Sequence, residues 1–190
     1  MVLDNYFVID IETCPLDMEK CDKLPEEEKR QLLNPIDSKV VAIGLRRNGI
    51  DKVFSGDEKK MLEDFWAEWK KAREGGAFIV GFNLLSFDLP FLTTRSFVNN
   101  VVISPFNLKT VIDLRDRISA YRFGHTRGTL KEFAALIGLK DFGMDGSQIA
   151  ELCKAGDMQT IIKYLKNDLL ITDEIFKRAR DTNILGIERW

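Results

Sequence analysis

The segment Tyr6-Phe-Val-Ile-Asp10-Ile-Glu12 decides the fold, because its apolar, β-branched residues predict a buried strand that ends in two acids. Side chains two positions apart on a strand point to the same face, so Asp10 and Glu12 are expected to converge. Two adjacent carboxylates repel each other unless one is protonated or a divalent cation lies between them. Acids also commonly end a strand at the solvent boundary, so this segment alone does not establish a metal site.

The segments that follow predict an α/β architecture, with a central mixed β-sheet flanked by helices, in one domain over residues 1–190. The charged stretch from Pro15 to Pro35 interrupts the sheet and has room for a short surface helix. Apolar, β-branched runs predict strands over residues 39–45, 50–54, 77–82 and 110–114. Apolar spacing and capping side chains predict helices over residues 57–73, 89–97 and 129–138, the last with a capping box from Thr129 to Glu132. Ser147 and Asp157 are the predicted caps of two further helices, the second of which runs over residues 158–180.

The composition is that of a soluble globular domain, with 45% hydrophobic and 31% charged residues in a chain of 190. No apolar run approaches the roughly 18 residues that a membrane-spanning helix requires. The first residues carry acids where a signal peptide needs Lys or Arg. We therefore expect a cytoplasmic protein with no membrane partner.

Cysteine and histidine usage excludes several kinds of site. Cys14, Cys21 and Cys153 form no C-x-x-C pair and are odd in number, which favours three reduced thiols over a disulfide framework or a zinc site. His125 is the single histidine of the chain. A zincin H-E-x-x-H motif and a metal centre with several histidines are therefore excluded.

A second candidate site follows the strand predicted over residues 77–82, where the sequence reads Gly81-Phe-Asn83-Leu-Leu-Ser-Phe87-Asp88-Leu-Pro90. An acid near a helix N-terminus stabilises the helix dipole, which is the structural explanation for Asp88. That explanation does not account for Asn83, Phe87 and Asp88 standing together at the end of a strand. The ends of strands are where open α/β sheets form their sites.

The third site lies in the helix predicted over residues 158–180. Its apolar residues recur at helical spacing, and Asp168 falls within that apolar stripe with Tyr164 one turn before it. A buried, unpaired carboxylate costs several kcal/mol, so Asp168 requires a cation, a donor network or a proton. No Arg or Lys shares the stripe on this helix. A metal ion held jointly with Asp10 and Glu12 would compensate all three charges.

Charge is unevenly distributed in a chain whose net charge is only -2. Residues 1–28 hold nine acids and two lysines, whereas residues 109–131 hold six cations and two acids. This distribution suits a polyanion that binds through metal ions at the first segment and directly at the second, although two unrelated solvated faces would give the same counts. The candidates for phosphate contacts, among which the sequence does not choose, are Arg115, Arg117, Arg122, Arg127 and Lys131.

These residues resemble a known family. The three motifs of the DEDDy 3'-5' exonucleases, and above all those of the proofreading exonuclease domain of family B DNA polymerases, are similar to Asp10-Ile-Glu12, Asn83-x-x-x-Phe87-Asp88 and Tyr164-x-x-x-Asp168. The flanking segments 111–114, 129–139 and 148–152 also resemble that family. The resemblance implies an RNase H-like fold. A chain of 190 residues cannot also hold a polymerase palm and fingers, so we expect a stand-alone exonuclease domain.

The resemblance also implies two Mg²⁺ or Mn²⁺ ions per active site and hydrolysis of phosphodiester bonds from the 3' end of single-stranded DNA, or of RNA, in a proofreading-like or DNA-repair role. Asp10 would bridge both ions, Glu12 and Asp168 would complete the first site, and Asp88 would support the second. Tyr164 would orient the attacking water by a hydrogen bond. The residues that would bind the substrate are Asn83, Thr13 and Phe87, with Phe123 as a further candidate for stacking on a base.

Two structural interpretations and three activities remain open at this point. Core packing is the preferred explanation of Phe87 over stacking on a base, and Asp113 is interpreted as a structural residue at a strand end. Besides the exonuclease, the fold could serve as a silent nucleic-acid-binding or scaffold domain, or as an endonuclease. Loss of any of the acids would favour the silent domain, and none is lost. An endonuclease has no use for Tyr164 at helical spacing before Asp168.

Overall fold

A five-stranded mixed sheet forms the centre of the chain in the computed structural model, which describes residues 3–122, 124, 127–141, 143 and 146–187. Its strand order is β3-β2-β1-β4-β5, with β1, β2 and β3 antiparallel and β4 and β5 parallel to β1. After β1, the chain first builds one edge of the sheet with β2 and β3, and it later adds β4 and β5 on the other side of β1. The strands are β1 (Tyr6–Pro15), β2 (Ser38–Arg47), β3 (Ile50–Ser55), β4 (Phe78–Gly81) and β5 (Val111–Asp113).

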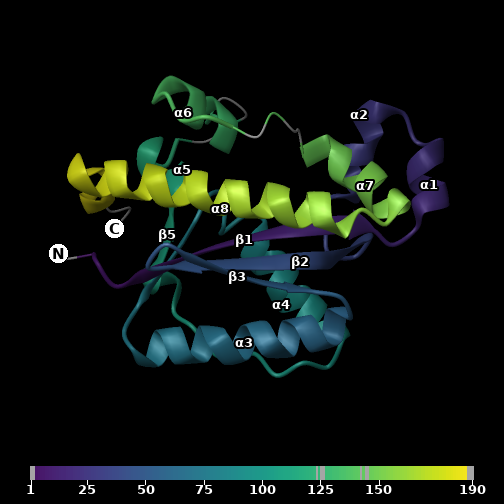
Figure 1. Cartoon of the computed structure of the whole chain (residues 1–190), viewed down its shortest axis with the longest axis horizontal. Helices are drawn as coiled ribbons and strands as arrows, with labels where there is room; N and C mark the ends of the chain where they lie inside the picture. Colours follow the sequence, from purple (N-terminus) through teal and green to yellow (C-terminus); the bar gives the residue numbers. More distant parts are fainter. Residues whose placement is uncertain (1–2, 123, 125–126, 142, 144–145, 188–190) are drawn as a thin grey trace.

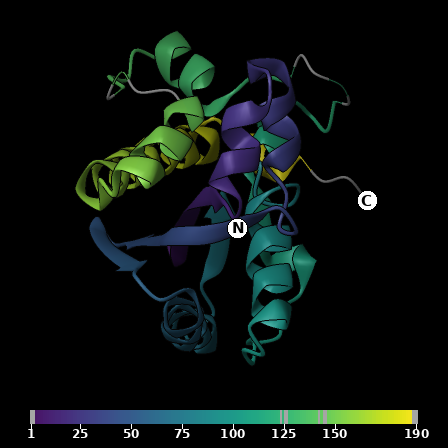
Figure 2. The ribbon, with the colours of Figure 1, turned by 90° about the vertical axis from the view of Figure 1, so that its right-hand side faces the viewer.

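Helices cover both faces of the sheet. Figure 2 shows α8 (Met158–Asp181) on one face and α3 (Glu58–Glu74) with α4 (Asp88–Val98) on the other. The short helices lie around the α8 face and the end of β1 (Figure 1), and they are α1 (Met18–Lys23), α2 (Glu26–Lys29), α5 (Leu114–Ile118), α6 (Leu130–Leu136) and α7 (Ile149–Ala155). Within the described ranges, no helix combines the length and the apolar character needed to cross a membrane.

The side chains of β1 divide between the two cores. Phe7, Ile9 and Ile11 are buried in the core that includes the aromatic residues of α3. Val8 points the other way and packs in the core under α8. Because strand side chains alternate, Asp10 and Glu12 continue the row of Val8 and lie on the α8 face. The strand that decides the fold therefore also delivers its acids to one particular layer.

Most predicted elements are confirmed within a few residues, including the Asp57 and Asp157 caps and the Thr129 capping box. The predicted Ser147 cap is wrong, because Gln148 is the N-cap of α7 and makes no side-chain cap hydrogen bond. The charged excursion holds two short α-helices and a 3-10 turn rather than one helix. Helix α5 was not predicted, since a single turn of five residues carries too little periodicity.

The expectation of three reduced thiols is wrong for two of the cysteines. Cys14, near the end of β1, and Cys153, in α7, form a disulfide with Cα atoms 6.4 Å apart, while Cys21 is free and buried. The two partners are separated by 139 residues, so no local spacing pattern could indicate the pair. They meet because α7 packs against β1.

Asp173, on α8, is a buried acid with partners at the start of the sheet. It accepts hydrogen bonds from the Tyr6 hydroxyl at 2.6 Å and from Arg46 Nε at 3.1 Å, and Lys177 Nζ lies 3.0 Å away. Burial alone would raise the pKa of Asp173, but these hydrogen bonds and charges bring the pKa below its ordinary value. This acid is therefore fully compensated, in contrast to the acids described next.

Candidate active site

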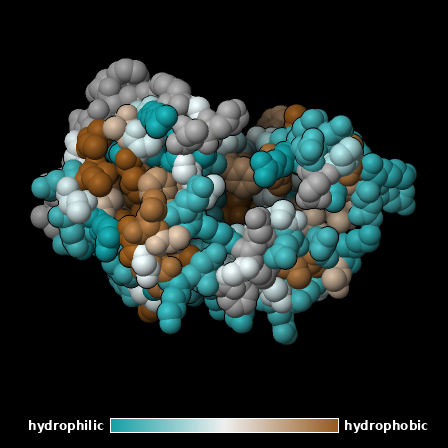
Figure 3. Space-filling model, turned by 90° about the horizontal axis from the view of Figure 1, so that it is seen from above, coloured by the Kyte–Doolittle hydropathy of each residue, from teal (hydrophilic) through white to brown (hydrophobic). Residues whose placement is uncertain are grey.

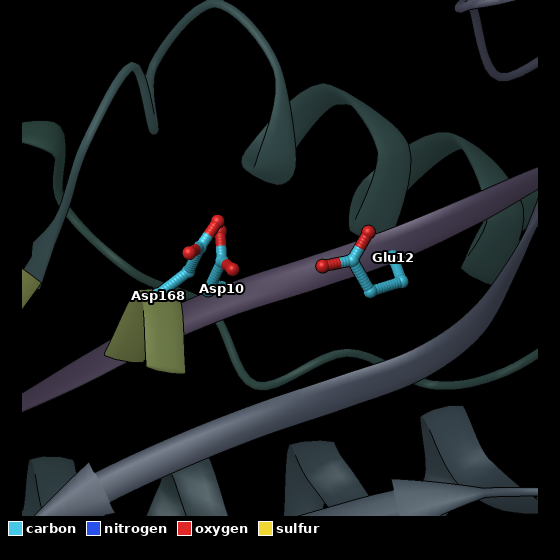
Figure 4. Close-up of side chains that lie close together, drawn as sticks. All are labelled: Asp10, Glu12 and Asp168. Carbon is cyan, nitrogen blue, oxygen red and sulfur yellow. The ribbon is translucent and has the colours of Figure 1, made fainter. Parts of the chain in front are cut away.

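Three carboxylates meet on the α8 face of the sheet. Asp10, Glu12 and Asp168 each offer an oxygen atom, and these atoms lie within 4.8 Å of one another. Figure 4 shows the carboxylates of Asp10 and Asp168 side by side, with Glu12 further along β1 and its carboxyl group turned toward them. Glu12 and Asp168 are each only 7% exposed. Such an all-oxygen set could hold a hard divalent cation.

A glycine allows α8 to approach the strand that carries the acids. Gly44 on β2 is the register partner of Asp10. A Cβ atom at Gly44 would lie 2.5 Å from Leu169 Cδ1 and 3.1 Å from Leu165 Cγ, both on α8. Any side chain at this position would force α8 away from the sheet. The missing Cβ of Gly44 therefore lets Asp168 stand over Asp10.

The sheet itself opens at the site. The parallel ladder between β1 and β4 ends with the pair Val8 and Val80, so β1 continues beyond it without a ladder partner on that side. The ladder with β2 shifts register between Glu12 and Thr13, which is a β-bulge. Bulges re-aim side chains and are frequent next to active sites. The two irregularities bracket the Asp10 and Glu12 pair.

Asp88 is a fourth acid and is only 2% exposed, in the first turn of α4. A backbone hydrogen bond from Ile11 lowers its pKa, but its Oδ1 atom is buried with no hydrogen-bond partner. An unsatisfied buried carboxylate oxygen is costly and requires an explanation. A cation near the cluster would supply one.

Burial is the main cause that raises the pKa of each of the four acids. The pKa values of Asp10 and Glu12 lie well above their ordinary values, first through burial and then through the charges of Asp88 and Asp168. Burial raises the pKa of Asp88 to about 8 and that of Asp168 to about 6. The acids therefore hold protons or attract a cation, and they do not coexist as four bare anions.

Tyr164 and Lys131 complete the cluster. Tyr164 lies one turn before Asp168 on α8 and is hydrogen-bonded to it, and burial followed by the charges of Asp168, Glu12 and Asp10 raises the pKa of its hydroxyl. Lys131 of α6 places its Nζ 4.8 Å from the centre of the Tyr164 ring and 3.5 Å from Asp141 Oδ2. Its charge opposes the upward pKa shifts of Glu12 and Asp168.

Lys131 is the residue of this cluster that the sequence did not single out. The helical stripe of α8 contains no cation, as expected, but α6 packs beside α8 and supplies one from another segment. The Nζ atom of Lys131 is buried and makes no hydrogen bond to any described residue. The sequence placed Lys131 among five candidate cations, and nothing in the order of residues distinguished it from the other four.

The three predicted substrate-binding residues lie on different elements. Thr13 is 7% exposed and lies just beyond Glu12. Asn83 begins the turn after β4 with a left-handed backbone (φ 60°), and its Oδ1 accepts a hydrogen bond from Arg115 Nη1 at 3.1 Å. Phe87 packs on Phe91 with ring centres 4.8 Å apart and joins the α3 core, as the packing interpretation predicts. Phe123 and His125 lie outside the described residues.

A cavity of about 700 Å³ is lined in part by Thr13, the residue that follows Glu12. It lies between the charged excursion and the start of α7, with Thr13, Cys21, Leu32, Gly146 and Ile149 among its lining residues. A Cβ atom built on Gly146 would be 3.6 Å from the Tyr164 hydroxyl, so this wall of the cavity lies next to Tyr164. Figure 3 shows the same face hollowed between the part that carries α6 and the part that carries α1 and α2.

Comparison with known proteins agrees with this geometry. The family model described as DNA polymerase family B, exonuclease domain, matches residues 5–130, which include the segments that carry Asp10, Glu12 and Asp88. The chain belongs to this family. A second model, described as a predicted 3'-5' exonuclease related to the exonuclease domain of PolB, matches residues 106–183 and includes Tyr164 and Asp168. The family resemblance of the three motifs is thereby confirmed.

The fold is also that of this family. The solved structure of the family B DNA polymerase from the hyperthermophilic archaeon Pyrobaculum calidifontis matches with a TM-score of 0.70 and 18% sequence identity. The match covers 94% of this chain and 25% of the polymerase, so the chain spans a quarter of that protein. The RNase H-like fold is confirmed. No curated protein matches the chain.

Proposed function

We propose that the chain is a metal-dependent 3'-5' exonuclease that removes nucleotides from the 3' end of single-stranded nucleic acid, with DNA as the substrate. The observation that carries this proposal is the meeting of Asp10, Glu12 and Asp168, with Tyr164 hydrogen-bonded to Asp168. The family to which the chain belongs supports the same reaction. An endonuclease with clustered acids does not require a tyrosine at this place.

The residues present fit two divalent ions. Three converging carboxylates and the unpartnered Oδ1 of Asp88 are oxygen donors of the kind that Mg²⁺ and Mn²⁺ prefer. Asp10 would be shared between the ions, Glu12 and Asp168 would hold one of them, and Asp88 would support the other. When bound, such ions polarise the scissile phosphodiester and make an attacking water more acidic.

The remaining groups of the site would orient and balance charge. The raised pKa of Tyr164 keeps its phenol protonated, so it would act as a hydrogen-bond donor that positions the attacking water and not as a base. Lys131, held against the Tyr164 ring, would stabilise negative charge that develops on the phosphate during the reaction. Asn83 and Thr13 would place the terminal nucleotide beside the acids.

Incubation with a single-stranded DNA oligonucleotide that is labelled at its 5' end tests the proposal. With Mg²⁺ or Mn²⁺ we expect a ladder of products that shorten one nucleotide at a time, and with EDTA we expect no product. A phosphorothioate at the 3'-terminal linkage should slow the reaction. Discrete internal cuts would indicate an endonuclease, and binding of the oligonucleotide without any cleavage would indicate a silent binding domain.

An RNA oligonucleotide of the same sequence, run beside the DNA, tests the substrate class. We expect the DNA to be degraded faster. Faster degradation of the RNA would show that the site belongs to a 3'-5' ribonuclease and not to a DNA exonuclease.

A further inference from the structure

The turn that carries Asn83 is held by a clamp from the neighbouring strand. Asp113 ends β5, is 3% exposed, and uses Oδ1 and Oδ2 to accept the backbone N–H groups of Asn83 and Leu85, each at 3.0 Å. Gly81 enters the same turn, and a Cβ atom there would lie 3.2 Å from the Ile9 carbonyl oxygen of β1. The backbone of the turn is therefore fixed against both β1 and β5.

The Asp113 carboxylate also positions Arg115, because its Oδ1 accepts the Arg115 backbone N–H at 3.0 Å. The side chain of Arg115 then reaches back to Asn83, where Nη1 donates to Oδ1 at 3.1 Å. The turn and the arginine thus share one anchor. Asp113 is structural, as the sequence indicated, but what it orders is the second motif.

The contact between Arg115 and Asn83 fixes which end of the amide faces outward. A guanidinium has only donors, so it must face the carbonyl oxygen of the amide, and the NH₂ group of Asn83 is left on the other side. On that side Asn83 presents hydrogen-bond donors to a ligand. Donors at this place suit the oxygen atoms of a nucleotide, either phosphate or hydroxyl.

Arg115 contacts the turn of the second motif, whereas Arg117 and Arg127 of the basic segment contact other groups. Arg127 is paired with Asp116, and Arg117 donates to the Ile187 carbonyl and lies over the Tyr121 ring. No carboxylate in the described part of the chain lies within salt-bridge distance of Arg115, and its Nε is buried without a hydrogen-bond partner. An arginine with a buried, unsatisfied Nε and no carboxylate partner lowers the stability of the fold. This cost indicates that Arg115 has a functional role.

We propose that Arg115 is a positioning residue of the exonuclease site, which orients Asn83 so that its NH₂ group donates to the 3'-terminal nucleotide. This inference rests on the proposed exonuclease function. It assigns no direct phosphate contact to Arg115.

The test compares steady-state kinetics of Arg115→Met, Asn83→Gly and the double variant on single-stranded DNA. Glycine suits the left-handed backbone at position 83, so this substitution removes the amide without strain. We expect each single variant to raise KM about tenfold with kcat nearly unchanged, the signature of lost substrate binding. The double variant should resemble either single one, because Arg115 acts through Asn83.

Salt dependence provides a second readout that a purely structural role would not change. Loss of a direct phosphate contact lowers the slope of log KM against log salt concentration by about one. We expect the slope of Arg115→Met to equal that of the unmodified chain. The control is Arg73→Met on α3, across the sheet from the acids. The Arg73 guanidinium also donates to a neutral acceptor, the Ala77 carbonyl, and this variant should keep the original KM.

Two results would overturn the inference. The first is that the KM increases of the two single variants multiply in the double variant and that Arg115→Met has a reduced salt slope, which would show that Arg115 binds phosphate directly. An unchanged KM in Arg115→Met would show that it does not act on the substrate at all. Both results require a working enzyme, whereas absence of a product ladder from the unmodified chain would contradict the proposed function itself.

Discussion

Replacing Asp10 with asparagine is expected to abolish exonuclease activity and, at the same time, to stabilise the metal-free protein. Burial, followed by the charges of Asp88, Glu12 and Asp168, raises the pKa of Asp10. The amide removes that repulsion, so the free energy of unfolding in EDTA at pH 8 should rise by about 1 to 3 kcal/mol. The same change removes a ligand shared by both proposed ions, and we expect kcat to fall by about 10³-fold or more.

Asp173→Asn is the matched control, because Asp173 is a buried acid of the same layer whose charge is compensated. Its carboxylate is paired with Arg46 and Lys177 and accepts a hydrogen bond from the Tyr6 hydroxyl, so the substitution leaves these groups without their charged acceptor. We expect a loss of about 3 kcal/mol in the free energy of unfolding, with kcat nearly unchanged. The two substitutions are chemically identical, yet they should change the free energy of unfolding in opposite directions, and only Asp10→Asn should lower kcat.

Urea denaturation in EDTA and single-turnover kinetics in Mn²⁺ measure the two effects. Asp10→Asn could instead destabilise the metal-free protein, as Asp173→Asn does. That result would show that hydrogen-bond donors stabilise the Asp10 carboxylate, and that the acids do not repel one another in a way that a cation would relieve. If Asp10→Asn retains more than a tenth of the activity, Asp10 does not have the shared position assigned to it. Opposite signs for stability and activity are typical of residues that are kept for function.

The acids could be predicted from the sequence because each belongs to a regular element. Asp10 and Glu12 follow the two-residue period of an apolar strand, and Asp168 interrupts an apolar stripe of a long helix. Each pattern predicts the face of its strand or helix on which a side chain lies, even when the element that packs against that face is not known. The cost of burying Asp168 then indicates that something else must lie close to it.

The features that no pattern revealed all depend on contacts between distant segments. Lys131 reaches the cluster from α6, and Cys14 pairs with Cys153 across 139 residues. In the sequence Gly44 cannot be distinguished from any other glycine of a strand. Its role is recognised only from the side chains of α8 that pack against it. Such residues carry no local period, so a single sequence contains no sign of them.

The stability of the metal-free protein should fall as pH rises from about 4 to about 8. Burial raises the pKa of Asp168 to about 6 and that of Asp88 to about 8, whereas both have an ordinary pKa of 3.8 when the chain is unfolded. Between these values the folded state binds more protons than the unfolded chain, so raising the pH favours unfolding. The lowered pKa of Asp173 acts below pH 4 and lies outside this window.

Divalent ions should cancel this decline, because they bind the deprotonated carboxylates of the folded state. Mn²⁺ at a hundred times its dissociation constant would add about 2.7 kcal/mol at pH 8, and much less at pH 5, where protons compete for the same oxygens. Urea denaturation at pH 5, 6, 7 and 8, in EDTA and in Mn²⁺, measures both trends. In Asp10→Asn the Mn²⁺ effect at pH 8 should largely disappear. A free energy of unfolding in EDTA that does not change with pH would show that the acids do not have raised pKa values. An Mn²⁺ effect of equal size at pH 5 and pH 8 would show that the ion does not bind to these carboxylates.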